Sequence, residues 1–282
     1  MRTNHAAGRG VWDGQRRLSR LQRGHTLLEW MIAAALGLVV LAGGLMVYRL
    51  QRETFSRSVD AATMREAGAA ALTLVGQQIQ LAGYAPVDQP ALRSRVTPGV
   101  FGCESARPDA RSVDEAACAS HPSDSADSDG IVARYVDDAV ATWPNASGEP
   151  TDCLGQAGDR QGEHALIVNR FYVAKPERRE APELYCAGSG ARTPQPIVEG
   201  VERMVLRYWL PGALEPVRAR AIAPVQWHNV VAVDLCVVVR GQRRAAGTVF
   251  VDCEGSRVSS PDGRTRLSLT RRVVLRNVDT AL

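Results

Sequence analysis

The segment from Trp30 to Tyr48 constrains this chain more than any other, because it contains no charged residue. Leu, Val, Ala, Met and Gly make up nearly all of it. As a helix it would span roughly 28 Å, close to the hydrocarbon core of a bilayer. An aromatic residue stands at each end, where interfacial anchors are common. We therefore expect one membrane-spanning helix near the N-terminus.

The residues before this segment are basic. Asp13 is the single acid before Gly24, against six arginines: Arg2, Arg9, Arg16, Arg17, Arg20 and Arg23. Since positively charged flanks stay in the cytoplasm, we expect the chain beyond Tyr48 to lie on the periplasmic side of the inner membrane. The formal net charge is +4, but 28 basic and 29 acidic side chains follow Gly24. That balance predicts no nucleic-acid partner for this part.

A carboxylate stands just before the apolar segment. Glu29 would cost about 2–3 kcal/mol near the start of a membrane helix, so a specific role is expected. If the chain is cut after Gly24, His25 carries a new α-amino group, and His25 and Glu29 share one helix face at i and i+4. The carboxylate could then neutralise the amine of a neighbouring subunit. The alternative is a Sec signal peptide or a plain signal anchor. The apolar run is too long for a Sec signal peptide, and a plain signal anchor would give Glu29 no role.

The sequence Arg23-Gly24-His25-Thr26-Leu27-Leu28-Glu29, followed by an apolar helix, resembles the class III signal peptide of type IV prepilins and pseudopilins. The resemblance implies that residues 1–24 are a cytoplasmic leader, which is long for this signal. It implies that a prepilin peptidase cuts after Gly24 and N-methylates the new N-terminus, His25. It also implies that Glu29 guides assembly into a filament. His25 departs from the Phe that the family prefers.

The helix is expected to continue beyond Tyr48, because Arg49–Gln80 contains no Pro and is rich in Ala, Leu and Gln. Gly83 is predicted to cap it and Pro86 to stop it. One face should be apolar and packed on a globular domain, with Phe55, Val59, Ala62, Leu72, Val75, Ile79 and Ala82. The opposite face carries Arg52, Arg57, Asp60, Arg65, Gln77 and Gln80.

The second half of the chain reads as strands. The strongest is Asn229–Val239, a nearly continuous apolar run that should be buried on both faces. The others are Ile131–Val136, Ala165–Ala174, Glu183–Ala187, Arg203–Leu210, Gly247–Cys253 and Arg266–Arg276, with a turn at Val198–Gly200. We therefore expect an α+β, type IV pilin-like fold, with one long N-terminal helix on a mostly antiparallel sheet. Its parts would be the leader 1–24, a transmembrane half 25–48, an amphipathic half 49–83, a disulfide-stapled loop 84–130 and a β-rich periplasmic domain 131–282.

Six cysteines follow the membrane segment, on the side where disulfides persist. They form no C-x-x-C motif, and six cysteines allow fifteen connectivities. We expect sequential pairs, with the alternative that one or two cysteines stay free and buried. The sequential pairs are Cys103–Cys118, Cys153–Cys186 and Cys236–Cys253.

The sequence suggests no enzyme. Only His121, His164 and His228 follow the membrane segment, and no hydrolase, zinc-protease or nucleotide-binding motif occurs. Asp124, Asp127 and Asp129 lack the spacing of a calcium loop and read as a solvated turn. We expect no catalytic residue, cofactor or metal site.

Segments further along resemble the PilW-type minor pilins. These are Gln80–Tyr84, Phe101–Cys103, Val198–Tyr208, Val230–Leu235 and Arg272–Asn277. This resemblance implies a minor pilin that primes assembly of a type IV pilus and caps or joins it, with roles in twitching motility and adhesion. Implied partners are the prepilin peptidase, other minor pilins (PilV, PilX, FimU and PilE types), the major pilin and a PilY-type tip adhesin. The implied location is the inner membrane as a single-pass protein, then the pilus or cell surface.

Two alternatives stay open. One is a J-type minor pseudopilin of a type II secretion system, which shares similar sequence blocks. The other is a membrane-anchored periplasmic binding module that never enters a filament.

Overall fold

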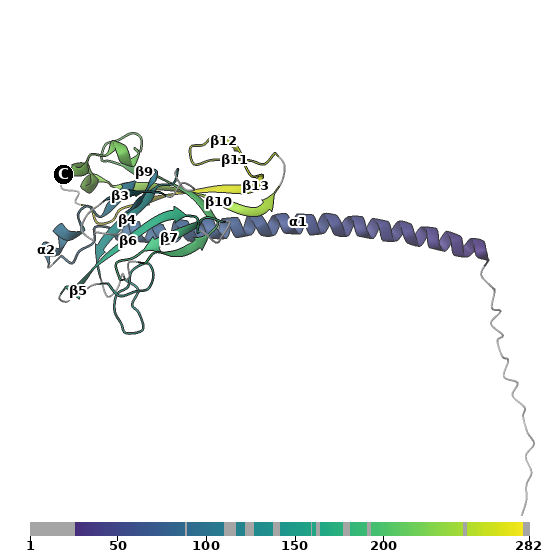
Figure 1. Ribbon diagram of the computed structural model, residues 1–282, viewed down its shortest axis with the longest axis horizontal. Coiled ribbons are helices and arrows are strands. Elements are labelled where there is room, and N and C mark those ends of the chain that lie inside the picture. Colours follow the sequence, from purple (N-terminus) through teal and green to yellow (C-terminus); the bar gives the residue numbers. More distant parts are fainter. Residues whose placement is uncertain are drawn as a thin grey trace, which may run out of the picture. The chain divides into compact units, whose positions relative to one another are not determined.

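The computed structural model describes residues 26–87, 89–109, 117–121, 127–137, 142–158, 160–161, 164–176, 181–190, 193–244 and 247–278. The chain forms two compact units, Met1–Thr54 and Phe55–Leu282. Helix α1 (Leu27–Leu81) begins in the first unit and ends in the second (Figure 1). All the strands described belong to the second unit.

Helix α1 is 55 residues long and contains no Pro. Gly83 follows its end with φ +78°, a left-handed conformation that Gly adopts without strain, so the predicted cap is confirmed. Within the second unit one face of α1 is buried at helical spacing. Its residues are Asp60, Met64, Gly68, Ala71, Leu72, Val75, Gly76 and Ile79.

This buried face differs from the predicted one where the second unit begins. Phe55 and Val59, expected on the apolar face, are 70% and 48% exposed, whereas Asp60, expected on the polar face, is buried. Asp60 is buried because its carboxylate accepts hydrogen bonds from Gln242 N and Thr265 Oγ1. The prediction is correct further on, for Leu72, Val75, Ile79 and Ala82.

Two antiparallel sheets lie against this half of the helix. The larger has the strand order β1-β4-β6-β7-β8, with β5 pairing β6. Its strands are β1 (Val100–Cys103), β4 (Gly130–Val136), β5 (Arg160–Gln161), β6 (His164–Ala174), β7 (Glu183–Ala187) and β8 (Gln195–Glu199). The smaller has the order β13-β10-β9. Its strands are β9 (Val201–Trp209), β10 (Ala232–Arg244) and β13 (Arg264–Val274).

Short elements complete the second unit. Two hairpins pair β2 (Ala106–Pro108) with β3 (Cys118–Ser120), and β11 (Val249–Val251) with β12 (Arg257–Ser259). The short helices are α2 (Pro90–Arg93), η1 (Ser94–Val96), η3 (Ala219–Ala221) and η4 (Pro224–Asn229).

Helix and sheets share one hydrophobic core. Val75 and Ile79 of α1 belong to the same buried cluster as Leu184 of β7, Leu206 of β9 and Leu235 of β10. Strand β10 is buried along nearly all of Ala232–Val239, as its apolar run predicted. The predicted fold class is confirmed: one long helix packs on antiparallel sheets.

Local differences from the sequence expectations have simple causes. The strand expected from Asn229 starts at Ala232, because Pro224–Asn229 forms a 3₁₀ helix instead. The turn expected at Val198–Gly200 is confined to Gly200, with φ +82°, because Val198 still pairs with Leu184. The segment expected as a stapled loop contains short elements, too brief for their periodicity to be read.

Candidate functional site

The start of helix α1 is closed by two reciprocal hydrogen bonds. Glu29 N donates to Thr26 Oγ1 at 3.3 Å, and Thr26 N donates to Glu29 Oε2 at 3.4 Å. This is a capping box, which satisfies backbone donors that a helix start leaves unpaired and stabilises it by about 1 kcal/mol. Thr26 was not singled out from the sequence, although Thr-x-x-Glu before an apolar run is the signature of this motif. Gly24 and His25 lie outside the described residues.

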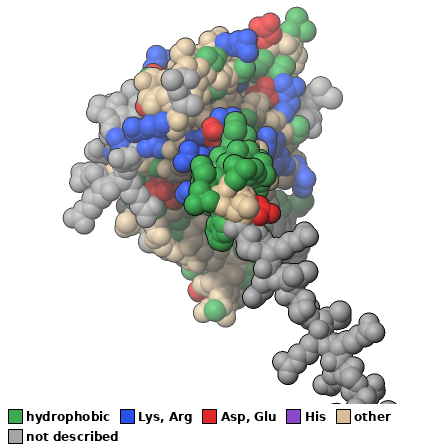
Figure 2. All heavy atoms as spheres, turned by 90° about the vertical axis from the view of Figure 1, so that its right-hand side faces the viewer, with side chains coloured by type: hydrophobic (Ala, Val, Ile, Leu, Met, Phe, Trp, Pro, Cys, Tyr) green, Lys and Arg blue, Asp and Glu red, His purple; other side chains and the backbone are tan. Residues whose placement is uncertain are grey.

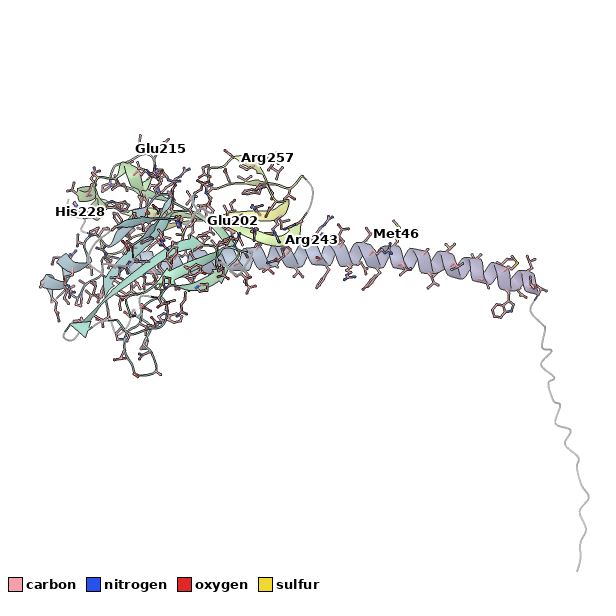
Figure 3. All side chains as sticks on the ribbon, in the orientation of Figure 1. Met46, Glu202, Glu215, His228, Arg243 and Arg257 are labelled. Atoms are coloured by element: carbon pink, nitrogen blue, oxygen red, sulfur yellow. A yellow bond between two sulfur atoms is a disulfide. The ribbon has the colours of Figure 1, made fainter. Side chains whose placement is uncertain are left out.

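The rest of the chain that the structure describes does not cover helix α1 between Glu29 and Val59. Every side chain from Thr26 to Val59 is exposed, and Trp30, Val40 and Met46 are 70%, 73% and 65% exposed. Figure 2, which looks onto the end of this helix, shows apolar side chains gathered around it, and Figure 3 shows Met46 projecting from it. Its most apolar window has a mean hydropathy of 2.3, so length and composition allow it to cross a membrane. Burying each large apolar side chain would contribute about 1.5–3 kcal/mol of favourable free energy. We therefore expect lipid or another protein to bind this surface.

The second half of the helix is fixed to the sheets at both ends. Asp60 accepts a hydrogen bond from Gln242 N at 2.7 Å and one from Thr265 Oγ1 at 2.5 Å. At the other end, Asn277 Nδ2 donates to the carbonyl oxygens of Gln80, Leu81 and Ala82 at 3.3–3.4 Å. These carbonyls are among the acceptors that a helix end leaves unpaired.

Between these two ends, helix α1 packs closely on strand β13. A Cβ atom on Gly68 would lie 2.4 Å from Leu269 Cδ1 of β13, so the absence of a side chain lets the strand approach. Helix α1 therefore forms one rigid piece with the sheets of the second unit, from Asp60 to its end.

A polar network connects the helix to the larger sheet. Gln78 Oε1 accepts hydrogen bonds from Tyr135 OH at 2.9 Å and from Asn169 Nδ2 at 2.7 Å. Asn169 Oδ1 in turn accepts one from Cys153 N at 2.9 Å. Burial raises the pKa of Tyr135 well above its ordinary value, so its hydroxyl stays a donor at neutral pH.

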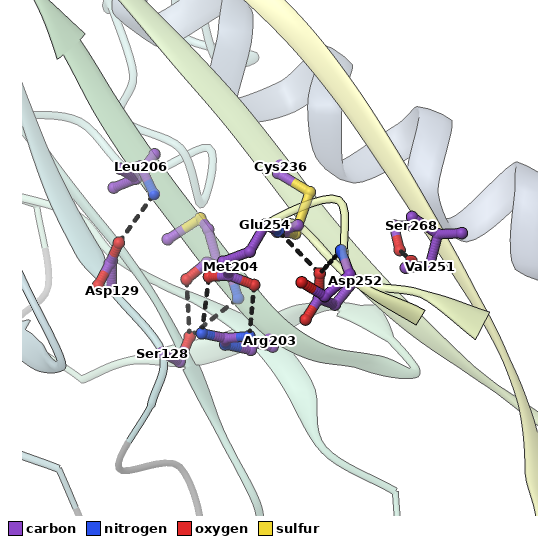
Figure 4. The surroundings of a disulfide bond; sticks show 12 residues. Ser128, Asp129, Arg203, Met204, Leu206, Cys236, Val251, Asp252, Glu254 and Ser268 are labelled. Carbon is purple, nitrogen blue, oxygen red and sulfur yellow. Dashed lines mark hydrogen bonds and ion pairs between the residues drawn. A yellow bond between two sulfur atoms is a disulfide. The ribbon is translucent and has the colours of Figure 1, made fainter. Parts of the chain in front are cut away.

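Three disulfides join Cys103 to Cys118, Cys153 to Cys186 and Cys236 to Cys253, which are the sequential pairs expected from the sequence. Each closes a separation of 15 to 33 residues, for which chain entropy predicts a stabilisation of about 3 kcal/mol. The last pair attaches the β11–β12 hairpin to β10 (Figure 4).

One charged pair fixes the same hairpin, and others join β13 to β9 and to the turn after β12. Arg203 of β9 forms a bidentate pair with Glu254, with N–O distances of 3.0 and 3.1 Å (Figure 4). Arg266 of β13 pairs with Glu202 at 2.5 and 2.8 Å and with Asp262 at 2.7 Å. The hydrogen bond from Arg266 is the main reason that the pKa of Asp262 lies well below its ordinary range.

Two of the acidic and histidine residues considered in the sequence, Asp129 and His164, form structural contacts. Asp129 accepts hydrogen bonds from Ser105 N and Leu206 N and pairs with Arg218 at 3.0 Å. His164 Nδ1 lies 3.0 Å from Asp137 Oδ1. Asp124 lies outside the described residues. Within the described ranges, no group of three or more His, Cys, Asp or Glu could hold a metal ion.

Comparison with known proteins finds two family models. Residues 170–277 match PilW, the type IV pilus-assembly protein W, and residues 19–45 match the prokaryotic N-terminal methylation motif. No curated protein matches the chain. Among solved structures, the chain is similar to a type IV-like pilin from Thermus thermophilus, with 13% sequence identity and a TM-score of 0.37. That comparison covers 76% of this chain and 95% of the other.

The two family matches cover the motif around Gly24 and Glu29 and three of the five segments that resemble PilW. The segments Gln80–Tyr84 and Phe101–Cys103 lie outside them. Pilins are in general structural rather than catalytic proteins, and the methylation motif implies processing by a prepilin peptidase. The chain is thus similar to PilW over residues 170–277 and carries the prepilin methylation motif over residues 19–45.

Proposed function

We propose that this chain is a minor pilin that is cut after Gly24, methylated at His25 and built into a type IV pilus. Residues 1–24 stay in the cytoplasm, 25–48 span the inner membrane and 49–83 continue the helix outside it. The disulfide-stapled segment 84–130 and the β-rich region 131–282 then form the periplasmic domain. In the pilus the chain primes assembly and caps or joins the filament, and so serves twitching motility and adhesion.

One observation carries this proposal: a wholly exposed apolar helix begins with a carboxylate. In the single chain, Glu29 accepts a hydrogen bond from Thr26 N and so belongs to the capping box. A bilayer covers the apolar side chains first, and the helices of neighbouring subunits cover them after extraction. The ammonium group of a neighbour's first residue then neutralises Glu29, which offsets the cost of a carboxylate in a water-poor bundle.

The other half of the chain supplies the specific surface. Asp60, Gly68 and Asn277 hold the helix on the sheets, so the second unit can follow its helix as one body into the filament. The partners we propose are the prepilin peptidase, other minor pilins of the PilV, PilX, FimU and PilE types, the major pilin and a PilY-type tip adhesin.

Processing is tested first, by intact mass and N-terminal sequencing of the membrane-extracted protein, with and without prepilin peptidase. We expect a chain that starts at His25 and is heavier by one methyl group only when the peptidase is present. A chain that keeps residues 1–24 under both conditions would overturn the proposal.

Assembly is tested with Glu29→Ala, and Glu53→Ala serves as the control because Glu53 is exposed on the same helix. We expect the Glu29 variant to be processed but depleted from sheared pili, with Glu53→Ala at the wild-type level. Wild-type amounts of the Glu29 variant in pili would contradict a role in assembly. Absence of the wild-type chain from pili would favour the anchored module.

A further inference from the structure

A cavity of about 580 Å³ lies between the end of helix α1, the larger sheet and the segment 142–158. Its volume falls within the range of small-molecule sites. Helix α1 contributes Leu74, Gln77 and Gln78, and Tyr84, Tyr135 and Trp143 add aromatic rings. None of the assembly residues lies in it.

The outer wall of this cavity is held in place. Asp152 Oδ1 accepts hydrogen bonds from Leu154 N at 2.9 Å and Gln156 N at 3.1 Å, and Oδ2 accepts one from Gly190 N at 2.9 Å. The disulfide between Cys153 and Cys186 fastens the same segment to β7. The cavity is therefore formed before any ligand arrives, which lowers the entropy cost of binding.

Trp143 combines a fixed backbone with an exposed side chain. Its carbonyl oxygen accepts hydrogen bonds from Thr151 Oγ1 at 2.7 Å and from Thr151 N at 3.1 Å. Its side chain is nevertheless 79% exposed, so packing within the second unit does not account for a Trp at this position. A flat aromatic face held at the edge of a cavity is suited to stacking on a ligand ring.

Oriented amide donors line the same space. Gln78 Oε1 is engaged by Tyr135 and Asn169, which fixes the amide plane. Among the described residues Gln78 Nε2 has no hydrogen-bond partner, and neither has the exposed side chain of Gln77. These two side chains therefore offer hydrogen bonds to a polar ligand.

The charged residues that line the cavity limit the class of ligand that it could bind. Arg276 and Asp152 are the only charged residues described in the lining, and the carboxylate of Asp152 already accepts three backbone hydrogen bonds. A single exposed Arg is too little for a polyanion, and the amides and hydroxyls do not suit an acyl chain. A neutral ligand with many hydroxyls and an apolar ring face fits these walls.

We propose that this cavity binds a neutral oligosaccharide. One sugar ring stacks its C–H face on Trp143, and hydroxyl groups of the bound sugar accept hydrogen bonds from Gln77 and Gln78. The site is independent of the assembly function, because it requires neither cleavage after Gly24 nor Glu29.

The test uses the full chain in a detergent without a sugar head group. Maltotriose, cellotriose, N-acetylchitotriose and mannotriose are the probes, detected by saturation-transfer NMR and titrated by isothermal calorimetry. We expect at least one of them to bind, with Trp143→Ala weakening the affinity about tenfold. Gln77→Ala should weaken it less, because it removes one exposed hydrogen-bonding side chain.

Leu214→Ala is the matched control, because Leu214 is 95% exposed and does not line the cavity. It should bind like the wild type, and all variants should melt at the wild-type temperature because the altered side chains are exposed. The proposal is overturned if none of the four sugars binds, or if Trp143→Ala binds as tightly as the wild type.

Discussion

Asp60→Ala tests whether one buried carboxylate holds helix α1 on the sheets. Asp60 is 8% exposed, and its two oxygens accept hydrogen bonds from the Gln242 amide and the Thr265 hydroxyl. The backbone lies close around it, since a Cβ atom on Gly241 would be 2.5 Å from Asp60 Oδ2. Removing the carboxylate leaves the Gln242 amide and the Thr265 hydroxyl without their acceptor.

The magnitude follows from these two bonds. A hydrogen bond to a charged group contributes about 1.5–3 kcal/mol. Because both donors bind the same carboxylate, their contributions do not simply add, and we expect Asp60→Ala to lower the free energy of unfolding by about 3 kcal/mol. Asp60→Asn keeps an acceptor for Gln242 N, and its Nδ2 can donate to Thr265 Oγ1. Asp60→Asn should therefore lower the free energy of unfolding by about half as much as Asp60→Ala.

The measurement is urea unfolding of the full chain in detergent, followed by near-UV circular dichroism, together with hydrogen exchange at the Gln242 amide. Glu66→Ala is the control, since Glu66 is an exposed carboxylate on the same helix and should change stability by less than about 0.5 kcal/mol. If Asp60→Ala matches this control and the Gln242 amide exchanges as in the wild type, the reasoning is wrong.

Three further predictions concern the second unit. Removing the Cys236–Cys253 disulfide with Cys236→Ser and Cys253→Ser should lower the free energy of unfolding by about 3 kcal/mol, and a loss under 1 kcal/mol would contradict the chain-entropy argument. The hydrogen bond from Arg266, which outweighs burial, holds the pKa of Asp262 below its ordinary 3.8. The stability contributed by Asp262 is therefore complete above about pH 4 and is lost as the pH falls below it. Asp262→Asn should flatten this acid limb in unfolding measured from pH 2 to 6, and an unchanged limb would refute the assignment. Tyr208 is fully buried, and no partner for its hydroxyl occurs among the described residues, a burial that costs about 1–3 kcal/mol. Tyr208→Phe should therefore unfold at the same or a higher urea concentration, and a clear loss of stability would imply a partner.

The features that sequence periodicity predicted are long and uniform. Helix α1 was predicted because no Pro interrupts it and Gly83 follows it, and β10 because its apolar run leaves no polar face. Strands β1, β2 and β3 have three or four residues each, which is at most two periods of a strand. Their pairing depends on neighbours such as β4, which no local pattern contains.

The capping box and the cavity mark two different limits of sequence reasoning. Thr26 and Glu29 are three residues apart, so their reciprocal bonds could have been predicted from the sequence alone. Trp143 and Gln78 are 65 positions apart in the numbering and share a cavity only because the segment 142–158 is fastened beside α1. Neither Trp143 nor Gln78 belongs to a motif, so chain folding has to bring them together before their chemistry can be recognised.

Glu29 and Asp60 show why residue type on a helix does not determine burial. Both are carboxylates on α1; the sequence predicted an assembly role for Glu29 and a place on the polar face for Asp60. Glu29 is exposed and has a bonding partner three residues away, whereas Asp60 is buried because its donors come from residues 242 and 265. Periodicity assigns each residue to a face of the helix. The free energy of burying its carboxylate, however, depends on whether hydrogen-bond donors from other segments of the chain reach it. The same residue type therefore closes the start of a helix at Glu29 and joins the helix to the sheets at Asp60.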